Sequence, residues 1–464
     1  MTSTLLITTL AAYQTRFWIP VARHLGDVGY RVVLLAFDDR SAEMCEAEGV
    51  ACRNVYRLGL AEGEPAVDDA SFSARAAALG IENVTLLFSH ERITFGIRDT
   101  ALLRRRFSIY ARALERILDE EDCARATMIQ ELGGFLSVIA SFHAARSRGV
   151  ENLFIEPSFF RGRYLLTPGS FAAPQIMGEP ASAASEEVLA YVAQARASRA
   201  IVIPEKDRHH YAAAFKKVLN ARNAVRLAEK VWDKAVLGKH QEFGHNIGHA
   251  LAHARMARNA LALKRAYRPF GSRPFVYYPL HVPADMALTI RSPEYLDQLA
   301  TIDFLLRTIP QGYDLVVKEH PAQIGAIDPR WIRALARRYD TFVLLPPTMN
   351  NFEVLSRASA VVTVNSKSGA EALMLGTPVV VTGDAFYTTC PLVVRADGLG
   401  DAPRALRRAL SEPVHAAEEA ALYFETAWRR SRPGELYTLD PARIATFAAS
   451  LVDALPRVHA LQDA

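Results

Sequence analysis

The amino-acid sequence predicts an α/β protein with two Rossmann-like domains whose parallel sheets face a central cleft. The chain has 464 residues, more than one compact core usually holds, so two domains are expected. In both halves, short runs rich in β-branched residues alternate with amphipathic stretches of helical length, the pattern of parallel βαβ units. Between the halves, residues 204–273 are strongly basic and have the pattern of long helices, which predicts a helical insertion.

The first half begins with a βαβ unit: a strand at 5–10, an amphipathic helix at about 17–28 and a strand at 30–37. The loop after the first strand lacks the GxGxxG pattern, so we do not expect a dinucleotide there. Further elements are expected as a helix at 97–121, a strand ending at 128–131, a helix from Gly133 to Arg148 and a strand at 152–156. This domain is assigned to residues 1–203.

The second α/β half is assigned to residues 274–430. Strands are expected at 275–278, 313–318, 341–345, 360–364 and 378–382, with helices at 293–308, 331–339 and 369–375. Two further helices are expected at 416–430 and 441–454. We expect residues 431–464 to pack back on the first domain.

Composition limits the kinds of partner. The net charge of +4 is modest, so nucleic acid is not expected, although an anionic substrate or a membrane surface would fit. The cysteines show neither metal nor redox spacing and are expected to be buried thiols: Cys45, Cys52, Cys123 and Cys390. No signal core and no stretch of about 20 apolar residues is present, so we expect a cytoplasmic protein able to contact the inner membrane from its cytoplasmic face.

Polar residues follow two predicted strands of the second half. Lys318, His320 and Pro321 end the strand at 313–318. After the strand at 360–364, a second group opens a helix: Asn365, Ser366, Ser368, Gly369 and Glu371. Open α/β sheets bind ligands at the carboxyl ends of their strands, and a helix N-terminus attracts anions. The two groups therefore predict a nucleotide-sugar pocket, with plain N-capping by either serine as the alternative.

Each side chain of this pocket has an expected role. His320 would donate to a phosphate or a sugar carboxylate, and Lys318 would add positive charge. Glu371 would accept from ribose hydroxyls, and Tyr387, after the next strand, would line the pocket or belong to an ordinary loop. No DxD follows a strand in this half, so we expect no metal clamp and no cofactor. The donor then releases a nucleoside monophosphate, or a pyrophosphate held by side chains and the helix dipole.

Three carboxylates are candidates for chemistry. Glu131 and Glu156 lie at strand ends of the first half, and Asp285 lies just beyond a strand of the second. One of them could act as nucleophile or base in a glycosyl transfer, with ion pairing or capping as the alternative role for each. Arg161 and Arg163 could hold a carboxylate of the acceptor or donor.

Histidines recur at helical spacing in the basic segment, at His245, His249 and His253. No carboxylate or cysteine joins them locally and HExxH is absent, so we do not assign them to a metal site. The basic face around them is expected either to be solvated or to form a platform for an anionic, lipid-linked acceptor.

Several of these segments resemble the bacterial capsule polysaccharide synthesis family, which includes retaining β-Kdo glycosyltransferases that use CMP-Kdo. The segments that carry the resemblance are 279–285, which contains His281, and 318–321, 364–373, 376–379 and 383–387. The resemblance extends over about residues 275–391, with similar strand-end positions at 130–134 and 154–156. Pro157 and Ser158 stand where some members have Asp-Gly, and residues 204–273 have no counterpart.

The resemblance implies a GT-B transferase that binds its donor on the second domain and transfers Kdo with retention through a carboxylate-linked intermediate. It implies that Asp285 or Glu156 attacks the anomeric carbon and that His320, Ser366 and Ser368 hold the CMP phosphate. The implied partners are a CMP-sugar and a glycan or glycolipid acceptor. Two alternatives stay open: a UDP-sugar transferase or 2-epimerase, and a non-catalytic polysaccharide-assembly subunit.

Overall fold

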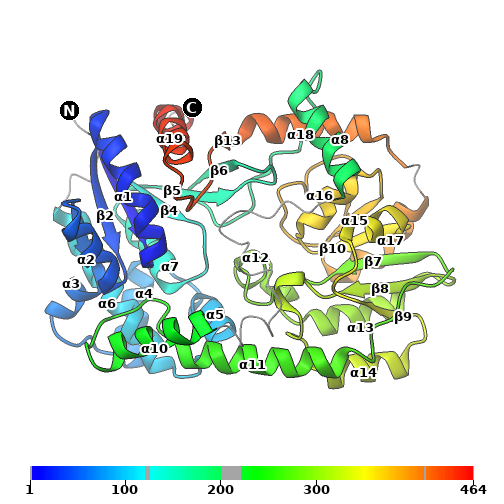
Figure 1. Ribbon diagram of the computed structural model, residues 1–464, viewed down its shortest axis with the longest axis horizontal. Helices are drawn as coiled ribbons and strands as arrows, with labels where there is room; N and C mark the ends of the chain where they lie inside the picture. Colours follow the sequence, from blue (N-terminus) through cyan, green and yellow to red (C-terminus); the bar gives the residue numbers. More distant parts are fainter. Residues whose placement is uncertain (1–2, 121–125, 200–220, 412–413, 463–464) are drawn as a thin grey trace.

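Two separate β-sheets organise the chain (Figure 1). The computed structural model describes residues 3–120, 126–199, 221–411 and 414–462. One sheet has the strand order β13-β6-β5-β4-β1-β2-β3 and the other β12-β11-β10-β7-β8-β9. Helices pack against both sheets, and the α/β fold of the GT-B type predicted from the sequence is confirmed.

The first sheet is parallel except at one edge. Its parallel strands are β1 (Thr4–Thr9), β2 (Arg31–Ala36), β3 (Cys52–Asn54), β4 (Ala126–Glu131) and β5 (Glu151–Pro157). β6 (Arg163–Pro168) and β13 (Arg432–Pro433) run antiparallel to their neighbours, and the sequence analysis missed both. All six residues of β1 are buried. This strand has no polar face because helices cover both sides of a parallel sheet.

The helices of this domain are α1 (Ala12–Asp27), α2 (Asp39–Ala47), α3 (Val55–Ala61), α4 (Asp69–Ala78), α5 (Val84–Phe95), α6 (Thr100–Glu120) and α7 (Leu136–Ser147). Residues 39–95, for which the sequence analysis proposed no element, hold four of them. Each is short and begins at a side-chain cap, as when Asn83 accepts the Leu86 amide 3.0 Å away at the start of α5.

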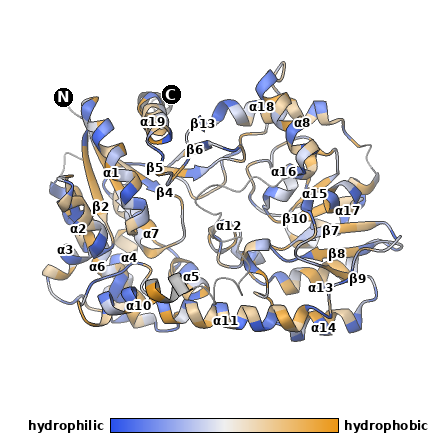
Figure 2. Ribbon diagram, viewed as in Figure 1, coloured by the Kyte–Doolittle hydropathy of each residue, from blue (hydrophilic) through white to orange (hydrophobic). Residues whose placement is uncertain are grey.

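The second sheet is wholly parallel. Its strands are β7 (Phe275–Pro279), β8 (Asp314–Lys318), β9 (Phe342–Leu345), β10 (Ala360–Thr363), β11 (Val379–Val381) and β12 (Val393–Arg395). The strands form apolar ribbons in Figure 2. Around them lie the helices α12 (Met286–Thr289), α13 (Gln298–Thr308), α14 (Pro329–Arg338), α15 (Asn351–Arg357), α16 (Lys367–Met374), α17 (Ala402–Ser411) and α18 (Ala417–Arg430).

Short 3-10 turns join these elements: η3 (Pro293–Tyr295), η4 (Pro321–Gln323) and η5 (Leu399–Asp401). The single helix predicted at 293–308 is wrong, because η3 and α13 divide that stretch. The Asp297 carboxylate accepts the Ala300 amide at 3.0 Å, which starts α13 at Gln298.

Segments at the end of each half cross to the other domain. α8 (Glu186–Ser198), although it follows β6 in the chain, packs against α18 of the second domain. In the other direction, β13 and α19 (Pro441–Gln462) return to the first domain. There the ring of Phe447 lies 5.0 Å from that of Phe17 on α1.

The basic segment runs along one edge of the molecule as α10 (Ala221–Ala235) and α11 (Asn246–Leu263) (Figure 1). The loop between α10 and α11 is held in the first domain, where Arg106 of α6 pairs with Glu242 of this loop at 3.0 Å and with Glu91 of α5 at 3.1 Å. The other end of α11 is held in the second domain, where Leu263 is fully buried in the core. α11 therefore bridges the two domains.

Among the helices of the described residues, none combines the length and the apolar character that crossing a bilayer requires.

Candidate active site

Three sequence motifs of the second domain meet at one edge of its sheet. β10, β7 and β8 are neighbours and run parallel, so the residues that follow them emerge side by side. The backbone amide of Asn365, after β10, donates to Nε2 of His281, after β7, at 3.3 Å. His320 follows β8 and acts electrostatically on His281. This edge therefore brings His281, His320 and Asn365 together.

Asp285 acts electrostatically on three imidazoles. Its carboxylate caps α12 by accepting the Ala287 amide at 2.9 Å, while the side chain stays exposed. Burial lowers the pKa of His281, His320 and His90 to about 4, and the negative charge of Asp285 partly offsets that effect at each ring. All three imidazoles are therefore neutral at pH 7.

His90 brings the first domain into this group, which we call the histidine cluster (His90, His281, His320 and Asp285). His90 lies on α5, and its Nδ1 is 2.8 Å from the hydroxyl of Thr289 at the end of α12. α5 and α12 lie next to each other where the two domains meet (Figure 1). The cluster therefore draws on both domains, and ligand sites occur preferentially where domains meet.

Hydrogen bonds fix where the protons lie in two of these neutral rings. Nδ1 of His320 accepts the Ala322 amide at 3.2 Å, so its proton is on Nε2. Nε2 of His281 accepts from Asn365, so its proton is on Nδ1. Within the described residues, that buried Nδ1 and the buried Oδ1 of Asn365 have no hydrogen-bond partner. Buried polar atoms without partners are costly unless a ligand or water satisfies them.

The start of α16 completes this edge. The Ser366 hydroxyl accepts the Ser368 amide at 3.2 Å, so capping by Ser366, the alternative raised from the sequence, occurs. The Tyr387 ring is buried beneath the helix, and its hydroxyl donates to the carbonyl of Ser366. A Cβ on Gly369 would lie 2.6 Å from the Tyr387 ring, so only glycine allows this packing. Tyr387 thus supports the helix start from below.

Lys318 and Glu371 lie deeper than the sequence suggested. Lys318 is 3% exposed, and its ammonium donates to the Met349 carbonyl at 3.1 Å. The Glu371 carboxylate accepts from Asn351 at 2.7 Å. Burial raises the pKa of Glu371 to about 7 and lowers that of Lys318 to about 8, while each charge favours the other. These two buried polar side chains lie beneath the site. Glu371 was expected to accept from ribose hydroxyls, but its carboxylate accepts from the Asn351 amide instead.

The first-domain carboxylates already have partners. Glu156 forms an ion pair with Arg291, the residue two positions after α12, at 2.9 Å, and a second guanidinium nitrogen lies 3.3 Å away. Arg291 also donates to the Phe171 carbonyl at 2.7 Å. Glu131 accepts from Gln14 at 2.9 Å and from the hydroxyl of Tyr437. Glu156 therefore links the domains, and Glu131 belongs to a network inside the first domain.

The two arginines of the sequence analysis lie apart from the histidine cluster. Arg163 donates to the Ser431 hydroxyl at 2.7 Å and lies 4.1 Å from the Trp428 ring, so it binds the end of α18. Its pKa is lowered by burial. Arg161 is exposed in the turn between β5 and β6.

Sequence reasoning missed His90 and Arg291. Neither belongs to a strand-end motif, and each reaches the site only through a tertiary contact. One signal was present: Gly134 follows β4, and a Cβ there would lie 2.6 Å from the His90 ring. Gly134 therefore makes room for an imidazole from another helix.

The neutral imidazoles should make stability depend on pH. Their pKa values are about 4 in the folded protein and near 6.5 when unfolded, so the unfolded state binds more protons between these values. Their contribution to stability is complete above pH 6.5 and is lost as the pH falls toward 4. We expect each to account for about 2 kcal/mol of lost unfolding free energy at pH 5. Urea unfolding at pH 7.5 and pH 5 measures this loss. The free energy of unfolding of His90→Asn should differ less between the two pH values than that of the wild type, and an equal difference in both proteins would contradict the prediction.

Within the described residues, no three His, Cys, Asp or Glu side chains come together in a way that could hold a metal ion. Two histidines at the start of α11 pack instead on an aromatic ring. The imidazole rings of His245 and His249 lie 5.2 Å and 5.1 Å from the ring of Phe95.

The fold and this strand-end site define a protein of the GT-B class. Residues 197–400 match the family described as capsule polysaccharide biosynthesis protein, which confirms the resemblance for that part of the chain. The match includes residues 204–273, so the expectation that this basic segment has no counterpart in the family was wrong. A stretch of 144 residues is 34% identical to Protein FixF of Sinorhizobium fredii. That match covers 30% of this chain and 33% of FixF, so the chain spans about a third of the length of this curated relative.

Solved structures show similarity in fold only. The β-Kdo 2,7 transferase of Thermosulfurimonas dismutans KpsC is 15% identical, with a TM-score of 0.37, over 74% of this chain and 89% of that one. The β-Kdo 2,4 transferase of the same protein is 14% identical, with a TM-score of 0.31, over 73% and 95%. The calicheamicin glycosyltransferase CalG4 is 12% identical, with a TM-score of 0.30, over 98% and 99%.

Proposed function

We propose that this protein is a glycosyltransferase of bacterial surface polysaccharide biosynthesis that transfers Kdo from CMP-Kdo, with retention and without a metal ion, to a glycan or glycolipid acceptor. The observation that carries the proposal is the histidine cluster at the start of α16, built within the family-matched segment and completed by His90 of the other domain. We place the protein in the cytoplasm at the inner membrane, where it would meet a glycolipid acceptor.

The CMP phosphate would bind between His320 and the start of α16. The Nε2 proton of His320 can donate to a phosphate oxygen, and the backbone amides at the helix start add further donors and a positive dipole. Asn365 and His281 offer one more unpartnered acceptor and donor for the sugar. Lys318 supports this region as a buried charge.

Asp285 is the carboxylate we assign as nucleophile. It is exposed, whereas Glu156 is held by Arg291 and Glu131 by Tyr437 and Gln14. Its carboxylate would attack the anomeric carbon, form a glycosyl ester and expel CMP. An acceptor hydroxyl would then attack the same carbon, release the aspartate and give its proton to a neutral imidazole of the cluster. Two inversions give net retention.

A turnover assay tests this function. Purified protein is incubated with CMP-Kdo in the presence of EDTA, and CMP release is followed by chromatography. Mass spectrometry of the intact protein then detects a covalent Kdo adduct. Release of CMP without metal, together with an adduct, supports the proposal. Turnover of a UDP-sugar and none of CMP-Kdo would favour the UDP-dependent alternative. Nucleotide binding without any turnover, even with lipid and glycan acceptors, would favour the assembly subunit.

His320→Ala should weaken donor binding. It removes a hydrogen bond to a charged phosphate, a loss of about 1.5–3 kcal/mol, or roughly 10- to 100-fold in Kd. Calorimetric titration with CMP measures the change, and His24→Ala in the last turn of α1 serves as the control. Tight CMP binding by the His320 variant would remove His320 from the phosphate site.

A further inference from the structure

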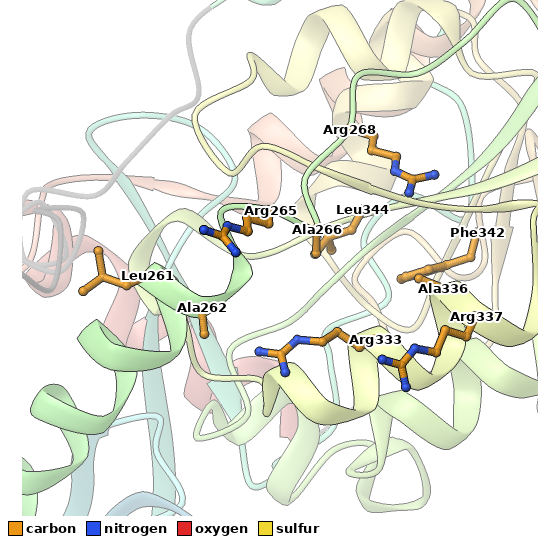
Figure 3. Close-up of a pocket in the computed structure, with 10 residues that line it drawn as sticks. All are labelled: Leu261, Ala262, Arg265, Ala266, Arg268, Arg333, Ala336, Arg337, Phe342 and Leu344. Atoms are coloured by element: carbon orange, nitrogen blue, oxygen red, sulfur yellow. The ribbon is translucent and has the colours of Figure 1, made fainter.

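An arginine-lined groove lies outside the candidate active site, between the end of α11, α14 and the edge strand β9. Its volume is about 690 Å³. Four guanidinium groups surround it, with Arg265 and Arg268 on one side and Arg333 and Arg337 on the other (Figure 3). The rest of the lining is apolar: Leu261, Ala262, Ala266, Ala336, Phe342 and Leu344.

The backbone fixes this arrangement. Arg333 and Arg337 are four residues apart on α14, so they project from the same face of the helix. Opposite them, the Arg268 amide donates to the Leu344 carbonyl at 2.9 Å, which lays the chain after α11 along β9. The two pairs of guanidinium groups therefore face one space (Figure 3).

The arginines of the groove form no ion pair within the part of the chain that the structure describes. Within the described residues, none of these four arginines has a carboxylate within 4.0 Å, whereas neighbouring Arg330 pairs with Asp328 at 2.7 Å. The sequences of α11 and α14 contain no acidic residue at all. Clustered guanidinium groups without partners attract phosphate, which they can bind in a bidentate manner.

Apolar side chains are exposed at the groove and elsewhere on the same helices. Leu261, which lines the groove, is 55% exposed, and Trp331, which lies on α14 outside the lining, is 61% exposed. Of the fourteen large hydrophobic side chains that are exposed among the described residues, eight lie on α10, the turn after it, α11 or α14: Val225, Trp232, Val236, Leu237, Ile247, Leu251, Leu261 and Trp331. These helices form one continuous edge of the molecule (Figure 1), and apolar and polar segments alternate along it (Figure 2).

We propose that this edge, formed by α10, α11 and α14, docks on an anionic phospholipid bilayer, and that the arginine groove receives the phosphate of a lipid headgroup. A basic surface with leucine, isoleucine and tryptophan side chains suits the boundary between headgroups and acyl chains. A soluble phosphate compound would need the guanidinium groups but not the exposed apolar rows along the same edge. Charge and apolar exposure together select the bilayer as the occupant.

Docking in this way would place both domains at the membrane. α11 contacts the first domain where His249 meets Phe95 and enters the core of the second at Leu263. A surface that includes α11 is therefore tied to both sides of the histidine cluster. This inference does not depend on the donor proposed above, because lipid binding requires neither nucleotide nor turnover.

Vesicle binding of the full chain tests the proposal. Sedimentation is measured with vesicles of phosphatidylcholine alone and of phosphatidylcholine mixed with phosphatidylglycerol. The test variant is Arg333→Glu with Arg337→Glu. The matched control, Arg404→Glu with Arg407→Glu, makes the same charge change on exposed positions of α17. Thermal unfolding of each variant verifies that it is folded.

We expect the wild-type protein to bind the anionic vesicles, the groove variant to lose roughly tenfold or more in partitioning and the control to stay within about twofold. Trp331→Ser should also weaken partitioning without changing the net charge. Equal losses in the groove variant and the control would overturn the groove as the site. So would failure of the wild type to bind anionic vesicles. If Trp331→Ser binds normally and inorganic phosphate at millimolar concentration displaces the protein, the ligand is a phosphate group alone and the bilayer proposal is wrong.

Discussion

Asp285→Asn is expected to lower turnover of CMP-Kdo by about 10³-fold or more while leaving CMP affinity within about twofold. Asparagine keeps the size of the side chain and can still accept the Ala287 amide that starts α12. It cannot form the glycosyl ester, because its amide is a poor nucleophile. The expected effect therefore falls on the chemical step. Initial rates of CMP release and calorimetric Kd values for the same preparations separate the two quantities.

Asp297→Asn provides the matched control. Asp297 also caps a helix of the second domain through its carboxylate, at 3.0 Å from the Ala300 amide, and is outside the histidine cluster. It should retain wild-type turnover. An Asp285 variant that turns over normally would remove the carboxylate from the reaction, and one that loses CMP binding as well would point to a role in donor binding.

The ion pair between Glu156 and Arg291 gives the second large effect. Arg291→Met leaves a carboxylate unpaired where the domains meet, with the two side chains only 10% and 18% exposed, and should cost about 3 kcal/mol of unfolding free energy. Combining it with Glu156→Gln removes the unpaired charge and should restore most of that loss. Urea unfolding of the single and double variants measures the coupling.

The same double variant distinguishes the two carboxylates. If Glu156 only links the domains, the double variant should keep turnover within about tenfold of wild type. A loss as large as that of Asp285→Asn would make Glu156 the catalytic carboxylate. Arg23 and Glu48, an exposed pair at 2.7 Å, are the control for stability, since breaking them should cost no more than about 1 kcal/mol.

The strands of the second sheet were predictable from the sequence, because buried parallel strands are short apolar runs rich in β-branched residues. The apolar runs before Lys318 and Asn365 are β8 and β10, and the residues after them emerge at one edge of the sheet. Whether the two motifs would be neighbours depended on strand order, which a single sequence does not contain. β7 lies between β8 and β10 and adds His281 to the same edge.

Features set by tertiary packing were less predictable. The spacing of residues around Lys318 gave no sign that Met349 and Glu371 would enclose it. Arg163 seemed suited to bind a carboxylate, but β13 returns from the far end of the chain and brings Ser431 to it. His90 joins the site from a helix of the other domain. In each case the partner is more than 30 residues away in the sequence, so no local pattern marks it.

The central claim is a site for a CMP-sugar that needs no metal, and a calorimetric titration with CMP, UDP and GDP, each with EDTA and with Mg²⁺, tests it most directly. A ligand at 100 times its Kd stabilises the native state by about 2.7 kcal/mol, so thermal unfolding offers a parallel readout. We predict selective binding of CMP that is the same in EDTA and Mg²⁺ and is weakened by His320→Ala. Preference for UDP, a requirement for Mg²⁺, or no response to any nucleotide by folded protein would contradict the claim.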